Sequence, residues 1–114
     1  MALKDRLTAA NSKIITASCA PGYSITNLQT SSDGMGGAMW TRIMAQSAED
    51  GTMPLLEACY GPSTESGDFW EPSLRGNMVG PAVKVKLTEE CIHEASRDML
   101  WKLSEEAIGS KWEL

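Results

Sequence analysis

Several features that would point to a common class of function are absent from this sequence. No apolar run approaches the roughly 20 residues needed to span a bilayer, and no lysine and arginine cluster offsets the net charge of −5. Nucleic acids and anionic membranes are bound through basic patches, so we expect neither as a partner. Charged residues 4–6 stand where a secretion signal would be apolar, so we expect a cytoplasmic protein.

Cysteine and histidine are also scarce. The three cysteines, Cys19, Cys59 and Cys91, are widely spaced and include no C-x-x-C pair. A zinc site or a disulfide framework is therefore not expected, and we interpret them as reduced, mostly buried thiols. The one histidine, His93, lies in a helical stretch beside Glu94, where a solvated side chain is the ordinary outcome.

No motif for catalysis stands out. Serine hydrolase chemistry needs a histidine near its nucleophile, and no two carboxylates have a spacing that marks an acid and base pair. The glycines of residues 76–82 loosely match a phosphate-binding loop, but Pro81 and the extended run after it replace the helix that such a loop opens. We therefore expect no catalytic residue and no metal site in this chain.

The length of 114 residues fits one domain, which we take as residues 1–114. Residues 2–11 have helical composition, and residues 13–20 are a short β-branched run typical of a strand. Ser47 is a good N-cap for a helix that continues to residue 60, although Pro54 removes one of its hydrogen bonds.

The second half predicts a short strand at residues 68–72, stopped by Pro72, and an irregular segment after it. Residues 82–87 alternate apolar and basic side chains, as an exposed strand or an extended arm would. Thr88 caps the clearest helix, which carries an apolar stripe and ends at Gly109. The stripe consists of Ile92, Ala95, Met99 and Leu103.

This order predicts an α/β fold with a parallel pair of strands joined by a right-handed crossover. Two strands make a poor independent sheet, so the chain looks incomplete. The strand at residues 13–20 ends at Pro21-Gly22 and a polar tip. That tip is either a surface turn or the edge of a ligand crevice.

A family resemblance bears on this choice. The run "IITASCAPGYSITNLQ" resembles the segment after the active-site helix of short-chain dehydrogenases/reductases, where a strand leads to Pro-Gly and a threonine four residues later, here Pro21, Gly22 and Thr26. Three further runs are similar to the family's late helix, its last core strand and the closing helix of its retinol-dehydrogenase-like branch. They are "SAEDGTMPLLEACYG", "ESGDFWEPS" and "SRDMLWKLSEEAIG".

The departures from the family are as informative as the matches. The family's catalytic tyrosine is followed four residues later by lysine, whereas Tyr23 is followed by Asn27 and Tyr60 by Thr64. The N-terminal glycine fingerprint is missing too, and Ala20 stands where many members have histidine. The resemblance thus covers only the C-terminal part, roughly two-fifths, of the fold. It implies an α/β chain with an incomplete doubly wound (Rossmann-like) fold, one or two parallel strands and about four helices.

The resemblance implies a nicotinamide cofactor, NAD or NADP, at the Pro-Gly corner and a substrate lid in the glycine-rich segment after it. The implied cofactor-binding residues are Pro21, Gly22, Ile25 and Thr26, and the implied substrate-binding residues are Tyr23, Met35, Met39 and Trp40. Methionine-rich helical stretches are also common as plain core, so the lid has that alternative.

Two functions follow as expectations. In the first, the chain is the substrate- and cofactor-facing segment of a short-chain oxidoreductase, inactive alone and completed by a complementary N-terminal chain. In the second, it is a self-associating module without catalytic activity, because the strand at residues 14–18 lacks one neighbour and would expose unpaired backbone groups. A homo-oligomer, formed by strand pairing or by exchange of the N-terminal helix, is the expected state in that case.

Overall fold

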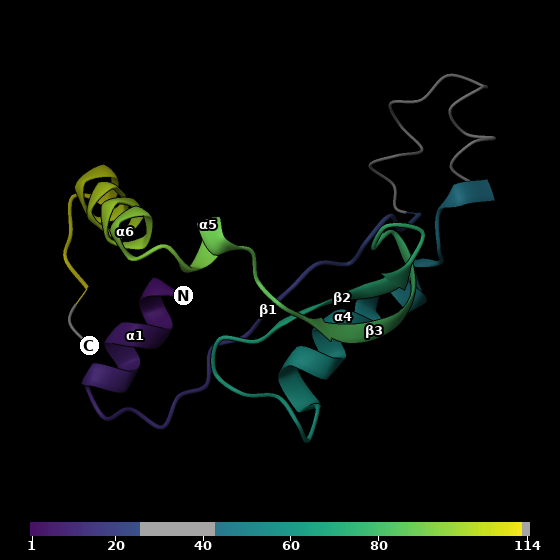
Figure 1. Cartoon of the computed structure of the whole chain (residues 1–114), viewed down its shortest axis with the longest axis horizontal. Helices are drawn as coiled ribbons and strands as arrows, with labels where there is room; N and C mark the ends of the chain where they lie inside the picture. Colours follow the sequence, from purple (N-terminus) through teal and green to yellow (C-terminus); the bar gives the residue numbers. More distant parts are fainter. Residues whose placement is uncertain (26–42, 113–114) are drawn as a thin grey trace.

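The computed structural model describes residues 1–25 and 43–112 and shows an α/β chain (Figure 1). Within these residues, four helices accompany a three-stranded mixed sheet. The elements are α1 (Ala2–Ala9), β1 (Ser18–Cys19), α4 (Ala48–Tyr60), β2 (Phe69–Leu74), β3 (Val79–Val85), α5 (Glu89–Ile92) and α6 (Glu94–Ile108).

The sheet has the strand order β1-β2-β3. β1 runs parallel to β2, with Ser18 opposite Phe69 and Cys19 opposite Trp70. β3 pairs antiparallel with β2 through a turn whose residues Arg75, Gly76 and Asn77 all have positive φ. The parallel pairing of β1 with β2 agrees with the prediction from the sequence. The antiparallel third strand was not part of that prediction, which had one or two parallel strands.

Pro72 does not end the second strand, so that prediction was wrong. β2 continues to Leu74, and the pairing register shifts between Pro72 and Leu74, which marks a bulge. A bulge accommodates a proline inside a paired strand because proline has no N–H to give to the ladder. The segment expected to be irregular after residue 72 therefore contributes to both strands.

The first strand is shorter than its β-branched run suggested. Only Ser18 and Cys19 pair as a strand, and the residues before them are extended without a ladder. The Thr16 amide donates to the hydroxyl of Ser66, and the Gly67 amide donates to the Thr16 carbonyl at 2.7 Å. A turn thus replaces a neighbouring strand along the start of this segment.

The core between α4 and the sheet is small. Trp70 and Pro72 of β2 are buried on the face that α4 covers, and Gly51 and Pro54 of α4 are buried as well. α4 runs from the Ser47 cap to Tyr60 as expected, with Pro54 inside it. It is the only described helix that packs extensively on the strands, so the two-sided cover of a doubly wound sheet is not formed by the described elements.

α1 and α6 form a second group, at the other end of the molecule from α4 and the β2–β3 turn (Figure 1). The Arg6 guanidinium lies 4.2 Å from the centre of the Trp101 ring, and Arg97 forms an ion pair with Asp5. Leu7 is the only large apolar side chain that these helices bury among the residues described. Cation–π and charge contacts therefore hold α1 to α6.

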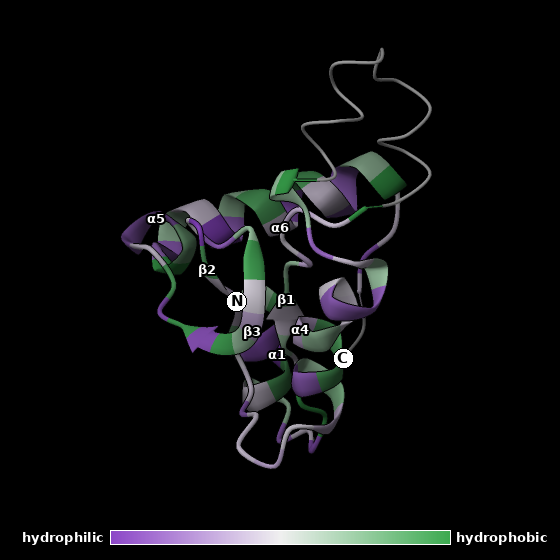
Figure 2. Cartoon of the chain, turned by 90° about the vertical axis from the view of Figure 1, so that its right-hand side faces the viewer, coloured by the Kyte–Doolittle hydropathy of each residue, from purple (hydrophilic) through white to green (hydrophobic). Residues whose placement is uncertain are grey.

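The C-terminal helix is not continuous, contrary to the sequence prediction. His93 has ψ 117°, which separates α5 from α6, while Gly109 ends α6 in the left-handed region as expected. Thr88 stands at the N-cap position of α5, but its side chain caps no backbone N–H. The apolar stripe is exposed: Ile92, Met99 and Leu103 are between 44% and 61% accessible. Figure 2 shows hydrophobic and hydrophilic residues interspersed along the helix ribbons.

Candidate functional site

The Pro-Gly corner lies at the carboxyl end of β1. Gly22 has φ +65°, and a Cβ there would stand 2.4 Å from the Met78 carbonyl oxygen and 2.7 Å from Cγ of Pro72. Only glycine allows both this conformation and this close approach. The corner is thereby packed against the bulge of β2 and the residue before β3, at the edge where both parallel strands end.

Two buried polar side chains close the corner from inside. The carbonyl oxygen of Pro21 accepts hydrogen bonds from Oγ of Ser24 and from Nε2 of Gln46, each at 2.9 Å. The amide oxygen of Gln46 in turn accepts from the Gly80 N–H at 2.9 Å. Ser24 and Gln46 are 6% and 8% exposed, so these bonds are shielded from water and stabilise one corner geometry.

Backbone hydrogen bonds join the corner to the chain that enters α4. Ile25 N–H donates to the Gln46 carbonyl, Gln46 N–H donates to the Tyr23 carbonyl, and both bonds measure 2.9 Å. Tyr23 N–H donates to the Met78 carbonyl at 2.6 Å. Residues 23–25 are therefore fixed on two sides, by the start of β3 and by Gln46.

The amino end of α4 adjoins the same corner. Ser47 caps the helix by accepting the Asp50 N–H at 3.0 Å. Gly51 lies one turn further along α4 and close to Ser24. A Cβ added at Gly51 would stand 2.1 Å from the hydroxyl oxygen of Ser24. The glycine thus allows the positive end of the helix dipole to approach the polar corner.

The structure gathers four of the eight residues named from the sequence. Pro21, Gly22, Tyr23 and Ile25 form the corner, whereas Thr26, Met35, Met39 and Trp40 lie outside the described residues. The Ile25 N–H is already donated to Gln46. Within the described part of the chain, no hydrogen bond is found at the Ile25 carbonyl oxygen.

Gln46 is the residue that sequence reasoning missed. Its side chain links three separate segments, because it bonds Pro21 and Gly80 while its backbone pairs with residues 23 and 25. A glutamine just before a helix cap has no local pattern that would identify this role. The only available signal was its position directly before Ser47, at the start of a helix.

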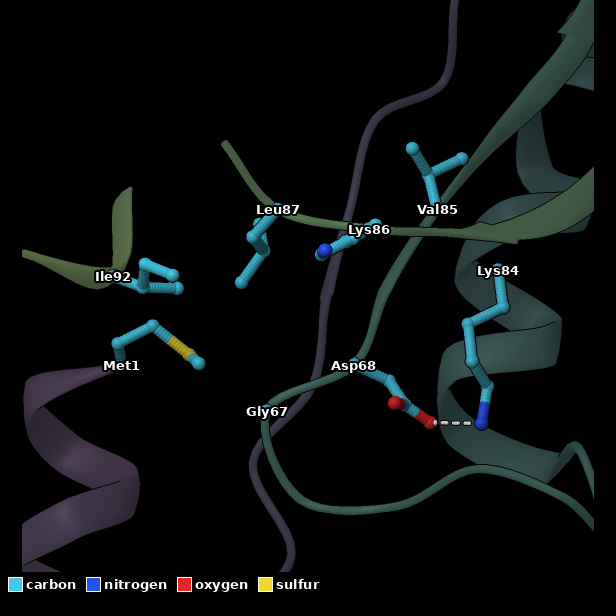
Figure 3. A pocket seen from close by; sticks show the side chains of 8 residues that line it. All are labelled: Met1, Gly67, Asp68, Lys84, Val85, Lys86, Leu87 and Ile92. Carbon is cyan, nitrogen blue, oxygen red and sulfur yellow. Dashed lines mark ion pairs between the residues drawn. The ribbon is translucent and has the colours of Figure 1, made fainter. Parts of the chain in front are cut away.

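A hollow lies at the opposite end of the sheet from the corner, where β2 begins and β3 ends (Figure 3). Its volume is about 390 Å³, and its walls include Met1, Leu87 and Ile92. Lys84 and Asp68 point toward each other there, with 2.7 Å between Nζ and Oδ2. This ion pair links β3 to the loop before β2.

The ion pair affects the acidity of Asp68. Burial alone would raise the pKa of this carboxyl, but hydrogen bonds from Lys84 and from the Glu65 N–H lower it, helped by the charges of Lys84 and Lys4. The net effect is a pKa below the ordinary value. Asp68 is therefore ionised at neutral pH and is not available as a general acid.

The cysteines differ from expectation. All three are free thiols, but Cys59 and Cys91 are exposed and Cys19 is half-buried, so the expectation of mostly buried thiols was wrong. Across residues 1–25 and 43–112, no three histidine, cysteine or acidic side chains gather as metal ligands do. No helix in these ranges is long and apolar enough to cross a membrane.

Comparisons with family models, with curated proteins and with solved structures found no match to this chain.

Proposed function

We propose that the chain is the C-terminal, cofactor- and substrate-facing segment of an NAD(P)-dependent short-chain oxidoreductase, and that it is inactive alone. The proposal places it in the cytoplasm. It rests on the resemblance of four ordered runs to that family. The structural observation that supports it is a rigid polar corner at the carboxyl end of a parallel strand pair, where open α/β sheets bind ligands.

The corner suits one side of a nicotinamide carboxamide. That group offers an NH₂ donor and a carbonyl acceptor, and the Ile25 carbonyl oxygen is an acceptor without a donor in the described chain. The Ile25 N–H is not free for the cofactor because Gln46 accepts it. The Thr26 hydroxyl is then the remaining group that the resemblance assigns to the amide.

The chain's own residues bind and orient in this proposal, but they do not move a proton. The two side chains that close the corner from inside, Ser24 and Gln46, are uncharged, and neither side-chain type exchanges a proton near neutral pH. The tyrosine and lysine of the family would come from a complementary N-terminal chain. The cofactor, when bound, would supply the hydride.

Calorimetric titration of NAD and of NADP into the isolated chain tests whether the corner binds the cofactor without the N-terminal part of the fold. We expect weak binding, with a dissociation constant on the order of millimolar, that Thr26→Ala abolishes. Thr52→Ala is the matched control, because Thr52 is an exposed threonine of α4 that bonds only within its helix. If neither cofactor binds, the corner is not a cofactor-binding site in the isolated chain.

A second candidate function is self-association, and the size of the core favours it. Leu7 and Trp70 are the only large apolar side chains that are buried among the described residues, while fifteen are exposed. β1 also lies at the sheet edge. Exposed apolar surface beside a strand with one free edge is typical of chains that associate.

A further inference from the structure

An uncharged groove lies between the β1 segment and α4. It has a volume of about 570 Å³, and residues 15–17 and 19 line it on one side and the last turns of α4 on the other, together with Leu3 of α1. Leu55, Ala58 and Cys59 of α4 contribute to its wall. None of its lining residues carries a charge, although the chain has 25 charged side chains in all.

The backbone beside this groove has unused hydrogen-bonding groups. Ser18 N–H donates to the Asp68 carbonyl and Ala20 N–H to the Trp70 carbonyl, both at 2.9 Å. Backbone groups alternate in direction along a strand, so those of Ala17 and Cys19 are turned away from β2. No described residue bonds the N–H of Ala17 or Cys19.

The segment that contains β1 could itself bind in the groove of a second copy, because it is uncharged and partly exposed. Residues 14–19 are uncharged, and Ile14 and Ile15 at their start are 64% and 60% exposed. An extended strand binds a sheet edge through its backbone, and its alternate side chains enter pockets. A second copy of the chain presents this strand, and a twofold axis satisfies both copies at once.

The surface of the molecule is large enough for such a contact. The chain exposes 8311 Å², whereas a compact monomer of 12.3 kDa exposes roughly 6,100 Å². A stable dimer buries about 800 Å² from each partner. The excess over a compact monomer is more than twice that area.

We propose that two copies of this chain pair through residues 14–19, each strand lying at the free edge of the other's β1 and against the groove beside α4. This deepens the second candidate function by naming the partner and the interface. The oxidoreductase ancestry is not needed for it. Cys19 and Cys59 line the groove, whereas Cys91 lies on α5 outside it. The reactivity of the first two thiols therefore reports on whether the groove is covered, and Cys91 is an internal control.

The test combines sedimentation velocity with thiol labelling over a range of protein concentrations, each cysteine being read by mass spectrometry. We expect the mass to double with concentration while labelling of Cys19 and Cys59 slows and that of Cys91 stays constant. At a concentration where about nine chains in ten are dimeric, only the monomeric tenth exposes the thiols of the groove. The labelling rate of Cys19 and Cys59 should then be about tenfold lower than in the monomer.

Two lysine substitutions locate the interface. Ala17→Lys puts a charge into the groove, and we expect a monomer whose Cys19 and Cys59 label quickly at every concentration. Ser18→Lys is the matched control: it is one residue away, its side chain is exposed and is not part of the groove lining, and its dimer should persist.

Three results would overturn the proposal. A wild-type chain that stays monomeric at all concentrations excludes both this interface and self-association. A dimer whose Cys19 and Cys59 label as fast as in the monomer excludes this interface alone and leaves self-association through another surface. Protection of the two thiols that appears only when an N-terminal oxidoreductase chain is added assigns the groove to that chain instead.

Discussion

At the scale of single residues, the corner depends on a few small or uncharged polar side chains. The sequence predicted the corner itself, because Pro-Gly after a β-branched run marks a turn. It could not predict Gln46, whose partner Gly80 is 34 residues away along the chain. Such a bond follows from the folded arrangement of α4 and β3, and no local pattern encodes it.

Gly22 and Gly76 allow a matched test of the packing at the corner. Both have positive φ, +65° and +66°, but a Cβ at residue 22 overlaps the Met78 carbonyl, whereas a Cβ at residue 76 meets no atom within 4 Å beyond its chain neighbours. Gly76→Ala should destabilise the chain by about 1–2 kcal/mol, the cost of the backbone conformation. Gly22→Ala should cost clearly more, as measured by urea unfolding. Equal losses would contradict the close packing.

Asp68 predicts a dependence of stability on pH. Because its pKa is lower in the folded chain than its ordinary value of 3.8, the Lys84 pair contributes stability above about pH 4, and this contribution is lost as the pH falls through the folded pKa. Urea unfolding at several pH values should show a smaller acid loss in Asp68→Asn than in the original chain. An identical loss in both would exclude the pair as its source.

At the scale of elements, the sequence located α4 and the end of α6 well because their signals are local: the Ser47 cap and Gly109. It failed at Pro72 and His93 for a different reason. The bulge that lets β2 pass Pro72 requires β3 as a partner. The break at His93 interrupts a stretch whose apolar residues recur at helical spacing, so the sequence did not indicate it. The apolar stripe in this stretch is not buried by any other part of the described chain.

The two predicted caps can be compared directly. Ser47 accepts the Asp50 N–H, so Ser47→Ala should lower the free energy of unfolding by about 1 kcal/mol. Thr88 caps no backbone N–H, so Thr88→Ala should change it by less than about 0.5 kcal/mol. Urea unfolding followed by circular dichroism measures both. A larger effect at Thr88 than at Ser47 would contradict the assigned cap geometry.

At the scale of the whole molecule, the chain is more extended than its length requires. Its radius of gyration is 17.2 Å, whereas a compact domain of 114 residues has about 13 Å. Among the described elements, one helix, α4, covers one face of the sheet, and α1 with α6 stands apart from it (Figure 1). These features agree with our proposal that the chain is a segment that needs another chain to complete its core.

The most direct test of this proposal is complementation. The chain is mixed with the N-terminal part of a short-chain dehydrogenase that ends after its tyrosine and lysine pair, and NAD(P)H oxidation is followed with a carbonyl substrate. Our account predicts that neither part is active alone, that the mixture is active, and that Gly22→Ala weakens the mixture more than Gly76→Ala does. A mixture in which the two parts bind each other but oxidise no NAD(P)H would contradict it.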